Sequence, residues 1–425
     1  METDTFSAED RTRIEARGLT VEEVERQAAL LRNPPPPAKL LRPCTAGDGI
    51  VRFEEGEHAE LLALADEAAR AGRLSKFVPA SGAASRMFAS VLGGGPESPE
   101  RKKFFESVDA FAFSFAGDLD RLAATPKGLL AFHRYPDGSR TAFEEHFFEA
   151  AYTVRDGVGT CRIHFTVLPA HRASFEQALS QVLPRVERLT RARFIVSFSE
   201  QAPSTDTVAI DEKGRLFRDS EGRLLFRPGG HGALLKNLAG TEGDIVLVKN
   251  IDNVVPDDLR APTLLWKRLL AGTLVRLERA STRARPLRVC GVVRNEGEPG
   301  GGPFWVGGPR GESRQIVESA EVDLANPEQA EIWRAATHFN PVDLACSLRD
   351  SSGRPFDLSR FVDERAVFIA KKTHEGRTLF ALERPGLWNG AMALWETVFV
   401  EVPKETFAPV KTALDLLRAE HQPRR

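Results

Sequence analysis

The clearest structural signal in this chain is the stretch KFVPASGAASRM at residues 76–87. Its first four residues are typical of a β-strand, and the six small residues that follow, ASGAAS, predict a loop before an apolar, helical stretch. Small side chains let backbone amides approach an anion, and a helix N-terminus adds a favourable dipole, so this order suits a phosphate. Arg86 would supply a fixed positive charge. An ordinary strand–helix turn with a surface arginine is the alternative interpretation.

Strand and helix patterns alternate along much of the remaining chain. Strand-like stretches occur at 162–168, 193–198, 244–249 and 287–293, and a helical stretch at 173–189 lies between the first two. This alternation is typical of an α/β protein with a mostly parallel sheet.

The N-terminal region has the pattern of helices. Residues 7–10 and 20–23 match the capping box, in which a hydroxyl and a carboxylate satisfy free amides at a helix start. Residues 57–72 form a third helical pattern. Residues 89–124 have the character of an insertion, with a Gly/Pro-rich link followed by a helical stretch rich in Phe.

Composition excludes several classes of protein. The 425 residues carry a net charge of −2, whereas a dedicated nucleic-acid binder usually shows a basic excess. The four cysteines are isolated, which excludes a disulfide scaffold or zinc ribbon and predicts a reducing compartment. No apolar run approaches 18 residues, and the polar, acidic N-terminus does not resemble a signal peptide. We therefore expect a cytoplasmic protein with no membrane span; the sequence does not indicate its oligomeric state.

Two further loops carry residues suited to polyphosphate or ligand contact. Lys127 lies in a turn just ahead of a strand-like LLAFH, where it either reaches a triphosphate or is a solvated turn lysine. His231 is surrounded by three glycines, which predicts a loop that a ligand approaches closely, with a simple glycine turn as the alternative. Residues 144–146 (EEH) share a helix face, but no other ligand spacing supports a metal site there.

Acidic and basic residues also follow two extended runs. The apolar strand at 245–249 ends in Asn250, Asp252 and Asn253, and a carboxylate at a strand's carboxyl end suits Mg²⁺, which prefers oxygen ligands plus substrate phosphates. The alternative is an Asx turn that closes the strand. Lys411 is either a second phosphate ligand or an ordinary lysine at a helix start.

Taken together and in this order, the motifs resemble those of the UDP-sugar pyrophosphorylases, the UDP-glucose and UDP-N-acetylglucosamine pyrophosphorylase group of nucleotidyltransferases. The pattern is most similar to a bacterial domain-of-unknown-function family related to that group. The segments that carry the resemblance are 80–87, 126–127, 198–201, 228–232, 249–253, 315–322, 339–340 and 407–411, and they span nearly the whole chain.

The chain departs from the group's pattern at several positions. The nucleotide loop of the group reads A-G-G-x-G-T-R-M, and here Ser81 and Ala84 replace glycines while Ser85 replaces threonine. Residues 249–253 read KNIDN where the group has S-N-I-D-N, and Asp343 stands where the group has the second asparagine of F-N-T-x-N.

The resemblance implies a role for individual residues of this chain. It implies a triphosphate held by cationic groups, an Mg²⁺ ion on a carboxylate, and a sugar phosphate beside them. The implied catalytic residues are Arg86, Lys127 and Lys411; the nucleotide-binding residues are Ala80, Ser81, Gly82, Ala83, Ser85, Gln201, Gly230, His231 and Gly232; the sugar-binding residues are Glu318 and Asn340; and the metal ligand is Asp252.

The resemblance also implies a fold and a domain plan. The expected fold is α/β, a GT-A-like and Rossmann-like mixed sheet flanked by helices, with an N-terminal helical segment. The predicted parts are a helical segment at 1–72, a nucleotidyltransferase-like core at 73–330 that contains the insertion at 89–124, and a C-terminal part at 331–425 that completes the sugar and phosphate site. Residues 295–304 have no counterpart in the group and are either a substrate loop or a hairpin turn.

The predicted activity is that of a nucleotidyltransferase, which makes a nucleotide sugar and pyrophosphate from a nucleoside triphosphate, with UTP as the expected example, and a sugar 1-phosphate. The sequence names neither the sugar nor the base. Two alternatives stay open. One is a GT-A-type glycosyltransferase, although its usual Asp-x-Asp occurs only at 118–120, in a helical stretch. The other is a non-catalytic nucleotide-sugar binding protein.

Overall fold

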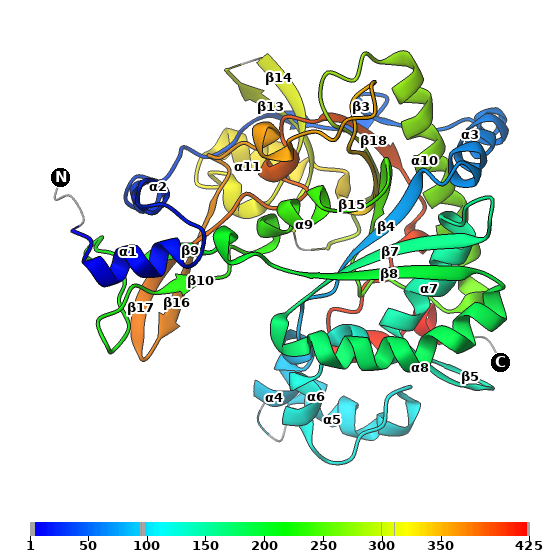
Figure 1. Ribbon diagram of the computed structural model, residues 1–425, viewed down its shortest axis with the longest axis horizontal. Helices are drawn as coiled ribbons and strands as arrows, with labels where there is room; N and C mark the ends of the chain where they lie inside the picture. Colours follow the sequence, from blue (N-terminus) through cyan, green and yellow to red (C-terminus); the bar gives the residue numbers. More distant parts are fainter. Residues whose placement is uncertain (1–4, 94, 96–97, 299, 310, 423–425) are drawn as a thin grey trace.

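A nine-stranded mixed sheet forms the centre of the computed structural model, which describes residues 5–93, 95, 98–298, 300–309 and 311–422 (Figure 1). One strand, β15, runs antiparallel to both of its neighbours, and the other pairings are parallel. The mostly parallel sheet predicted from the sequence is therefore confirmed. In spatial order the strands are β2 (Thr45–Ala46), β3 (Gly49–Val51), β18 (Glu396–Glu401), β12 (Leu287–Arg294), β15 (His338–Ser347), β11 (Ile245–Val248), β4 (Leu74–Pro79), β7 (Thr160–Val167) and β8 (Arg193–Glu200).

Strand β11 shows how the sheet separates two apolar cores. Ile245 and Leu247 pack into one core, and Val246 and Val248 pack into the other. Because successive side chains of a strand point to opposite faces, an unbroken apolar run indicates a strand covered on both sides. The first core lies under α3 (His58–Arg70), α7 (Ala142–Thr153), α8 (Arg172–Thr190) and α10 (Ala261–Ala280); the second lies under α9 (Leu235–Ala239) and residues 387–395.

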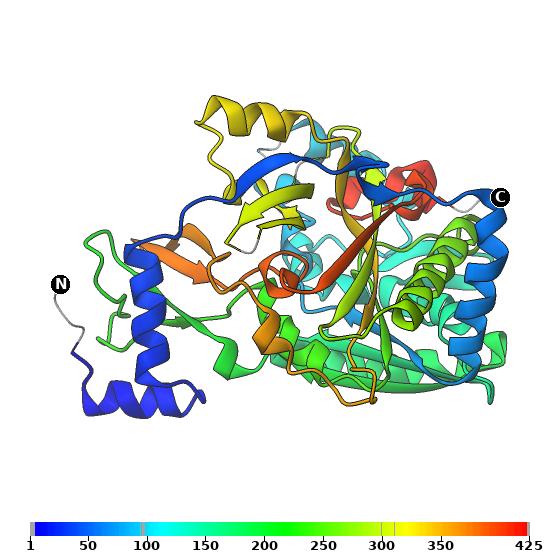
Figure 2. The same cartoon turned by 90° about the horizontal axis from the view of Figure 1, so that it is seen from above.

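The N-terminal helices contact different sheets. Helices α1 (Ala8–Glu15) and α2 (Val21–Arg32) pack on a four-stranded sheet at one end of the molecule, whereas α3 packs along α10 at the other end (Figures 1 and 2). The strands of the small sheet are, in spatial order, β10 (Phe226–Arg227), β9 (Thr207–Ile210), β17 (Arg377–Glu383) and β16 (Phe368–His374). The division of the chain at residues 72 and 330 stays a prediction.

The first predicted capping box is confirmed, and the second is only half formed. Ser7 accepts from the Asp10 amide at 3.1 Å while Asp10 accepts from the Ser7 amide at 3.0 Å. Thr20 caps α2 through the Glu23 amide, but the Glu23 carboxylate accepts instead from Arg26 and Gln27. The long side chain of Glu23 therefore stabilises the next turn of the helix instead of its start.

The insertion at 89–124 is helical and aromatic, as predicted; part of its Gly/Pro-rich link lies outside the described residues. It contains α4 (Ala89–Gly93), α5 (Pro99–Glu106) and α6 (Leu119–Ala124). Phe104 stacks on Phe111 at a ring-centre distance of 5.2 Å, so the insertion has its own aromatic cluster joined to the main core. The hairpin of β5 (Ala131–Tyr135) and β6 (Gly138–Thr141) follows.

A three-stranded sheet lies next to the central one. Its strands are β1 (Lys39–Pro43), β13 (Gly302–Gly308) and β14 (Gly311–Val317), and α11 (Pro327–Arg334) packs on β1. The stretch 295–304 leads from β12 in the central sheet to β13 in this one, so the hairpin interpretation is wrong. None of the helices in the described part of the chain is long and apolar enough to span a bilayer.

Candidate active site

The chemistry-bearing loops meet at one edge of the central sheet. Strands β4, β7, β8 and β11 are parallel, so their carboxyl ends lie together, and antiparallel β15 brings its amino end to the same edge. The Ile251 amide donates to the Pro79 carbonyl oxygen at 3.3 Å, which places the loop 250–253 directly beside the start of the loop 80–87. Ligands of open α/β sheets bind at such an edge.

Asp252 contacts two of the predicted catalytic residues, both of them lysines. Its Oδ2 atom lies 2.7 Å from Lys127 Nζ and 3.4 Å from Lys411 Nζ, although these lysines are more than 120 residues away on either side in sequence. Burial raises the pKa of Asp252, but the two ammonium groups outweigh burial and hold that pKa below its usual value. The carboxylate is therefore ionised at neutral pH, with two cations on one oxygen.

The insertion begins and ends at the same place, and this explains how Lys127 reaches the loop. The Ala84 amide donates to the Thr125 carbonyl oxygen at 3.0 Å, and the Lys127 amide donates to the Gly82 carbonyl oxygen at 3.1 Å. Residues 89–124 thus leave the loop 80–87 and return to it. Lys127 returns to the loop 80–87, and its side chain is largely buried, with 13% of its area exposed.

The loop 80–87 is followed by only a short helix. A short 3₁₀ turn at Ala84–Arg86 lies at the end of the loop and the five-residue α4 follows it, where the sequence predicted a helical stretch. So short a helix contributes little dipole, which leaves the loop amides and the cations to bind an anion. Gly82 is exposed, and a Cβ atom there would meet nothing within 4 Å, so its backbone is open to a ligand. Arg86 is exposed and makes no ion pair within the described ranges.

The loop 228–232 places His231 beside Lys411. Its ring contacts Trp388 edge to face at 4.5 Å, and burial together with the charge of Lys411 lowers the pKa of His231 to about 4. His231 as a whole residue is exposed to solvent. The next residue, Gly232, has no room for a side chain, because a Cβ atom there would lie 1.9 Å from the Pro385 carbonyl oxygen.

The remaining predicted residues lie at the same edge or near it. Gln201 follows the last residue of β8 and is half-buried. Asn340, in β15, donates from Nδ2 to Glu318 Oε1 at 2.7 Å, and burial raises the pKa of Glu318. The Asn340 Oδ1 atom is buried without a hydrogen-bond partner among the residues described, and it lies against Gly301 of the stretch 295–304.

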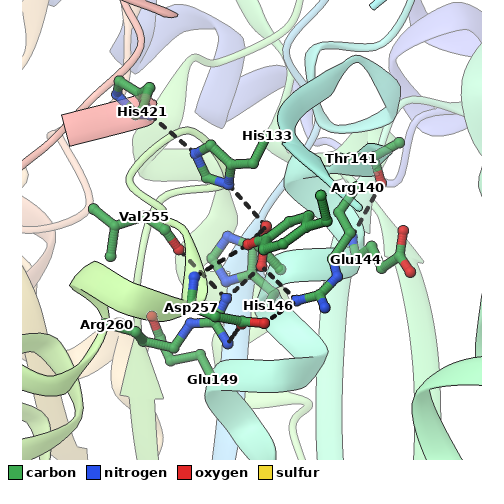
Figure 3. Close-up of polar contacts among 12 residues, drawn as sticks. His133, Arg140, Thr141, Glu144, His146, Glu149, Val255, Asp257, Arg260 and His421 are labelled. Carbon is green, nitrogen blue, oxygen red and sulfur yellow. Dashed lines mark hydrogen bonds and ion pairs between the residues drawn. The ribbon is translucent and has the colours of Figure 1, made fainter. Parts of the chain in front are cut away.

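Two buried polar clusters on α7 lie outside the set of predicted site residues. In the first, the Glu145 carboxylate accepts from His133 Nδ1 at 2.8 Å, from the Tyr135 hydroxyl at 2.8 Å and from Arg260 (Figure 3). His133 Nε2 lies 3.1 Å from His421 Nδ1, which ties the C-terminal segment to the hairpin β5–β6.

The second cluster surrounds Glu149, one turn further along α7, and consists of Lys76, Lys249, Lys267, Glu149 and Asp343. A charged residue on a helix that is apolar on all sides was the available signal for both clusters. The part of the chain that the structure describes contains no group of three or more His, Cys, Asp or Glu side chains suited to a metal ion.

These features define a class of fold: a mixed α/β sheet of the nucleotidyltransferase type, with a small-residue loop and paired lysines at the carboxyl edge. The chain is similar over nearly its whole length to solved structures of that class. They include the UDP-N-acetylglucosamine pyrophosphorylase of Trypanosoma brucei (15% identity, 97% of this chain and 79% of that one, TM-score 0.59). They also include a mutant form of the Leishmania major UDP-glucose pyrophosphorylase (16% identity, 98% and 79%, TM-score 0.56).

The chain belongs to the family described as a domain of unknown function, DUF4301, whose matches cover residues 7–123, 118–284 and 280–422. The predicted fold class and the predicted resemblance are thereby confirmed. A curated relative, the glucosyl-3-phosphoglycerate synthase of Mycobacterium tuberculosis, is 33% identical over 140 residues. This match covers 32% of the present chain and 42% of the relative, so the chain spans less than half the length of that protein.

Proposed function

We propose that this chain is a nucleotidyltransferase that joins a nucleoside triphosphate to a sugar 1-phosphate. The observation that carries the proposal is the convergence of Lys127, Lys411 and Asp252 beside the loop 80–87. The fold shared with pyrophosphorylases supports it. Two polyanions must approach each other in this reaction, so fixed cations and positioning dominate its catalysis.

In the proposed reaction, a phosphate oxygen of the sugar 1-phosphate attacks the α-phosphorus of the triphosphate. The bond from that phosphorus to the bridging oxygen breaks, and pyrophosphate leaves with the electron pair. Arg86 and Lys127 hold the triphosphate and neutralise the leaving pyrophosphate, while Lys411 holds the sugar phosphate against the α-phosphorus. No covalent enzyme intermediate is required. The loop 80–87 and Gln201 contact the nucleotide, His231 with its flanking glycines lies between nucleotide and sugar, and Glu318 with Asn340 binds the sugar.

The donor set at Asp252 fits an Mg²⁺ ion. The Asp252 Oδ2 atom contacts the ammonium groups of Lys127 and Lys411. The Oδ1 atom is buried and has no hydrogen-bond partner in the described ranges, so this oxygen is free for a cation. Mg²⁺ commonly binds through one carboxylate together with substrate phosphates and water. When bound, the ion would supply charge neutralisation on the phosphate oxygens.

The direct test is pyrophosphate release with Mg²⁺, using the four common nucleoside triphosphates crossed with a panel of sugar 1-phosphates. We expect release that requires one nucleotide and one sugar phosphate. Lys127→Ala is expected to lower turnover about 100-fold, because loss of one cation costs ~3 kcal/mol of barrier. Lys213→Ala, in the exposed turn that follows β9, is the matched control and is expected to keep wild-type turnover. Near-normal turnover by Lys127→Ala contradicts the assigned role.

A glycosyltransferase is the second candidate, favoured by the 140-residue similarity to the M. tuberculosis synthase. The two activities differ in their released product. Release of a nucleoside diphosphate from a nucleotide sugar, in the presence of a phosphorylated acceptor and without pyrophosphate, identifies the glycosyltransferase. Nucleotide-sugar binding without either release identifies a non-catalytic binding protein.

A further inference from the structure

Five charged side chains are buried together directly beneath the candidate active site. We call them the lysine cluster: Lys76, Lys249, Lys267, Glu149 and Asp343. Each has at most 4% of its surface exposed. The cluster contains three lysines and two carboxylates, and burial lowers the pKa of Lys76 to about 7, towards its neutral form. Burying an unpaired charge costs several kcal/mol, so such a group persists only where its members pair well.

Glu149 is the centre of the cluster. Its Oε1 atom lies 2.7 Å from Lys76 Nζ and 2.8 Å from Lys267 Nζ, and its Oε2 atom lies 3.1 Å from Lys249 Nζ. Although burial raises the pKa of Glu149, the three lysines hold that pKa well below its usual value. Asp343 completes the cluster through Lys267 and through Lys249, whose Nζ lies 3.5 Å from Asp343 Oδ2.

The members of the cluster come from the elements that carry the three parts of the site. Lys76 lies on β4, four residues before Ala80; Lys249 lies three residues before Asp252; and Asp343 lies three residues after Asn340 on β15. The cluster therefore connects the loop 80–87, the loop 250–253 and strand β15 to one another.

Helix α7 adds a second connection between the same elements. The Lys76 ammonium donates to the His146 carbonyl oxygen at 3.1 Å, and His146 Nε2 lies 3.2 Å from the Ile251 carbonyl oxygen. His146 and Glu149 are one turn apart on α7 (Figure 3). Helix α7 therefore contacts Ile251 through His146 and the preceding Lys249 through the Glu149 carboxylate.

Two cluster positions are among those at which the sequence departs from the pyrophosphorylase pattern. Position 249 is a lysine instead of serine, and position 343 is an aspartate instead of asparagine. The structure brings these opposite charges together, 94 residues apart in sequence and 3.5 Å apart in space. A change at position 249 leaves Asp343 with Lys267 as its partner, and a change at position 343 leaves Lys249 with Glu149. Each single change therefore alters the net charge of the cluster, whereas the two together keep it.

We propose that Lys249 and Asp343 are positioning residues, which act as a buried pair to hold Asp252 in place against the loop 80–87. This inference rests on the proposed function of the site for its kinetic consequence. Its structural consequence, an ordered loop at 250–253, is independent of any activity.

A double-mutant cycle tests the pair with Lys249→Ser, Asp343→Asn and the combined variant. Each single change is expected to lower kcat at least tenfold with the KM for the triphosphate changed less than threefold. The combined variant, which keeps the net charge of the cluster, is expected to return to within threefold of wild type. Should a single variant fail to fold, Lys249→Gln replaces it because it keeps a hydrogen-bonding head.

The signs of these effects distinguish positioning from charge alone. Lys249→Ser removes a positive charge and Asp343→Asn removes a negative one, so a purely electrostatic role predicts opposite changes in kcat. Opposite changes, unchanged kcat in both single variants, or a combined variant as slow as the slower single variant would overturn the proposal. The same cycle on Arg268 and Asp66, a half-exposed pair 2.6 Å apart on the outer helices, is the control and is expected to leave kcat unchanged.

Hydrogen–deuterium exchange of the peptide 249–254 provides a readout that needs no substrate. The Lys249, Ile251 and Asn253 amides all donate to backbone carbonyl oxygens. Faster exchange in each single variant and wild-type exchange in the combined variant are expected. If the wild type releases no pyrophosphate, the proposed function fails while this measurement still tests the pair, and unchanged exchange in both single variants overturns the proposal.

Discussion

At the scale of single residues, the two oxygen atoms of Asp252 have different environments. Oδ2 is shared by two lysines, whereas Oδ1 is buried and has no partner among the described residues. A buried acceptor without a hydrogen bond lowers the stability of the fold by about 1–3 kcal/mol. A carboxylate that served only to neutralise lysines would not need such an unpaired oxygen. The arrangement is suited to a ligand that arrives with the substrates.

Asp252→Asn tests this assignment. The amide keeps the size of the side chain but removes the charge, so both Mg²⁺ affinity and lysine placement are lost. We expect turnover in the pyrophosphate-release assay to fall at least 100-fold, with circular dichroism unchanged. Asp109→Asn, an exposed aspartate of the insertion, is the control. An Asp252→Asn enzyme that keeps a tenth or more of wild-type turnover contradicts the metal role.

At the scale of elements, Asn253 holds the C-terminal segment at the site through two hydrogen bonds and connects it to β15 through a third. Asn253 Nδ2 donates to the Val342 and Thr406 carbonyl oxygens at 3.4 and 3.3 Å, and its Oδ1 accepts from the Ala408 amide at 2.9 Å. The neighbouring Val410 amide donates to the Asp252 carbonyl oxygen at 3.1 Å. The position of Lys411 is thus set by the loop that follows β11.

Removing this connection is expected to act through Lys411. Asn253→Ala leaves the Ala408 amide unpaired, which costs about 1–3 kcal/mol of stability, and it frees the segment that carries Lys411. We expect kcat to fall about tenfold. In a Lys411→Ala background the same change is expected to alter kcat less than twofold, because the group it positions is already absent. Additive losses in the double variant would show that Asn253 acts by another route.

At the scale of the whole molecule, buried histidines make stability depend on pH. Burial lowers the pKa of His421 to about 3 and of His164 to about 4, and it lowers the pKa of His146 well below its usual value. In the unfolded chain these rings bind protons below about pH 6.5, whereas the folded protein keeps them neutral. Stability therefore falls as the pH falls from 6.5 towards 4.

Glu321 acts in the opposite direction over part of this range. Burial raises its pKa to about 7, so the folded protein binds its proton while the unfolded chain does not until about pH 4.5. His231, whose pKa is lowered to about 4, adds to the effect of the three histidines, and Glu318, whose pKa burial raises, adds to that of Glu321; the histidines outnumber these two carboxyl groups. We expect the urea midpoint to be lower at pH 4.5 than at pH 7, and Glu321→Gln to steepen that loss. A midpoint that rises on acidification, or a shallower loss in Glu321→Gln, would contradict this balance.

The local sequence was sufficient for several strands of the central sheet and for the helical insertion, and it singled out the residues proposed for the site. Strand and helix periods depend on neighbouring residues, so the strands ending near Pro79 and Val248 and the helical insertion were predicted correctly. The small-residue loop and the strand-end aspartate were recognised because their chemistry is local. The length of the helix after residue 87 was not predicted, because α4 ends where the chain turns into the insertion.

Contacts between distant residues depended on the topology of the sheet. Lys127 meets Asp252 because the insertion returns to its starting point, and Lys249 meets Asp343 because β15 runs antiparallel beside β11. His133 meets His421 across 288 positions. Periodicity and motif spacing report on residues a few positions apart, whereas these ion pairs form only after strands from separate parts of the chain lie side by side and exclude water. The sequence therefore specified which groups were available, and the packed sheet determined which of them pair.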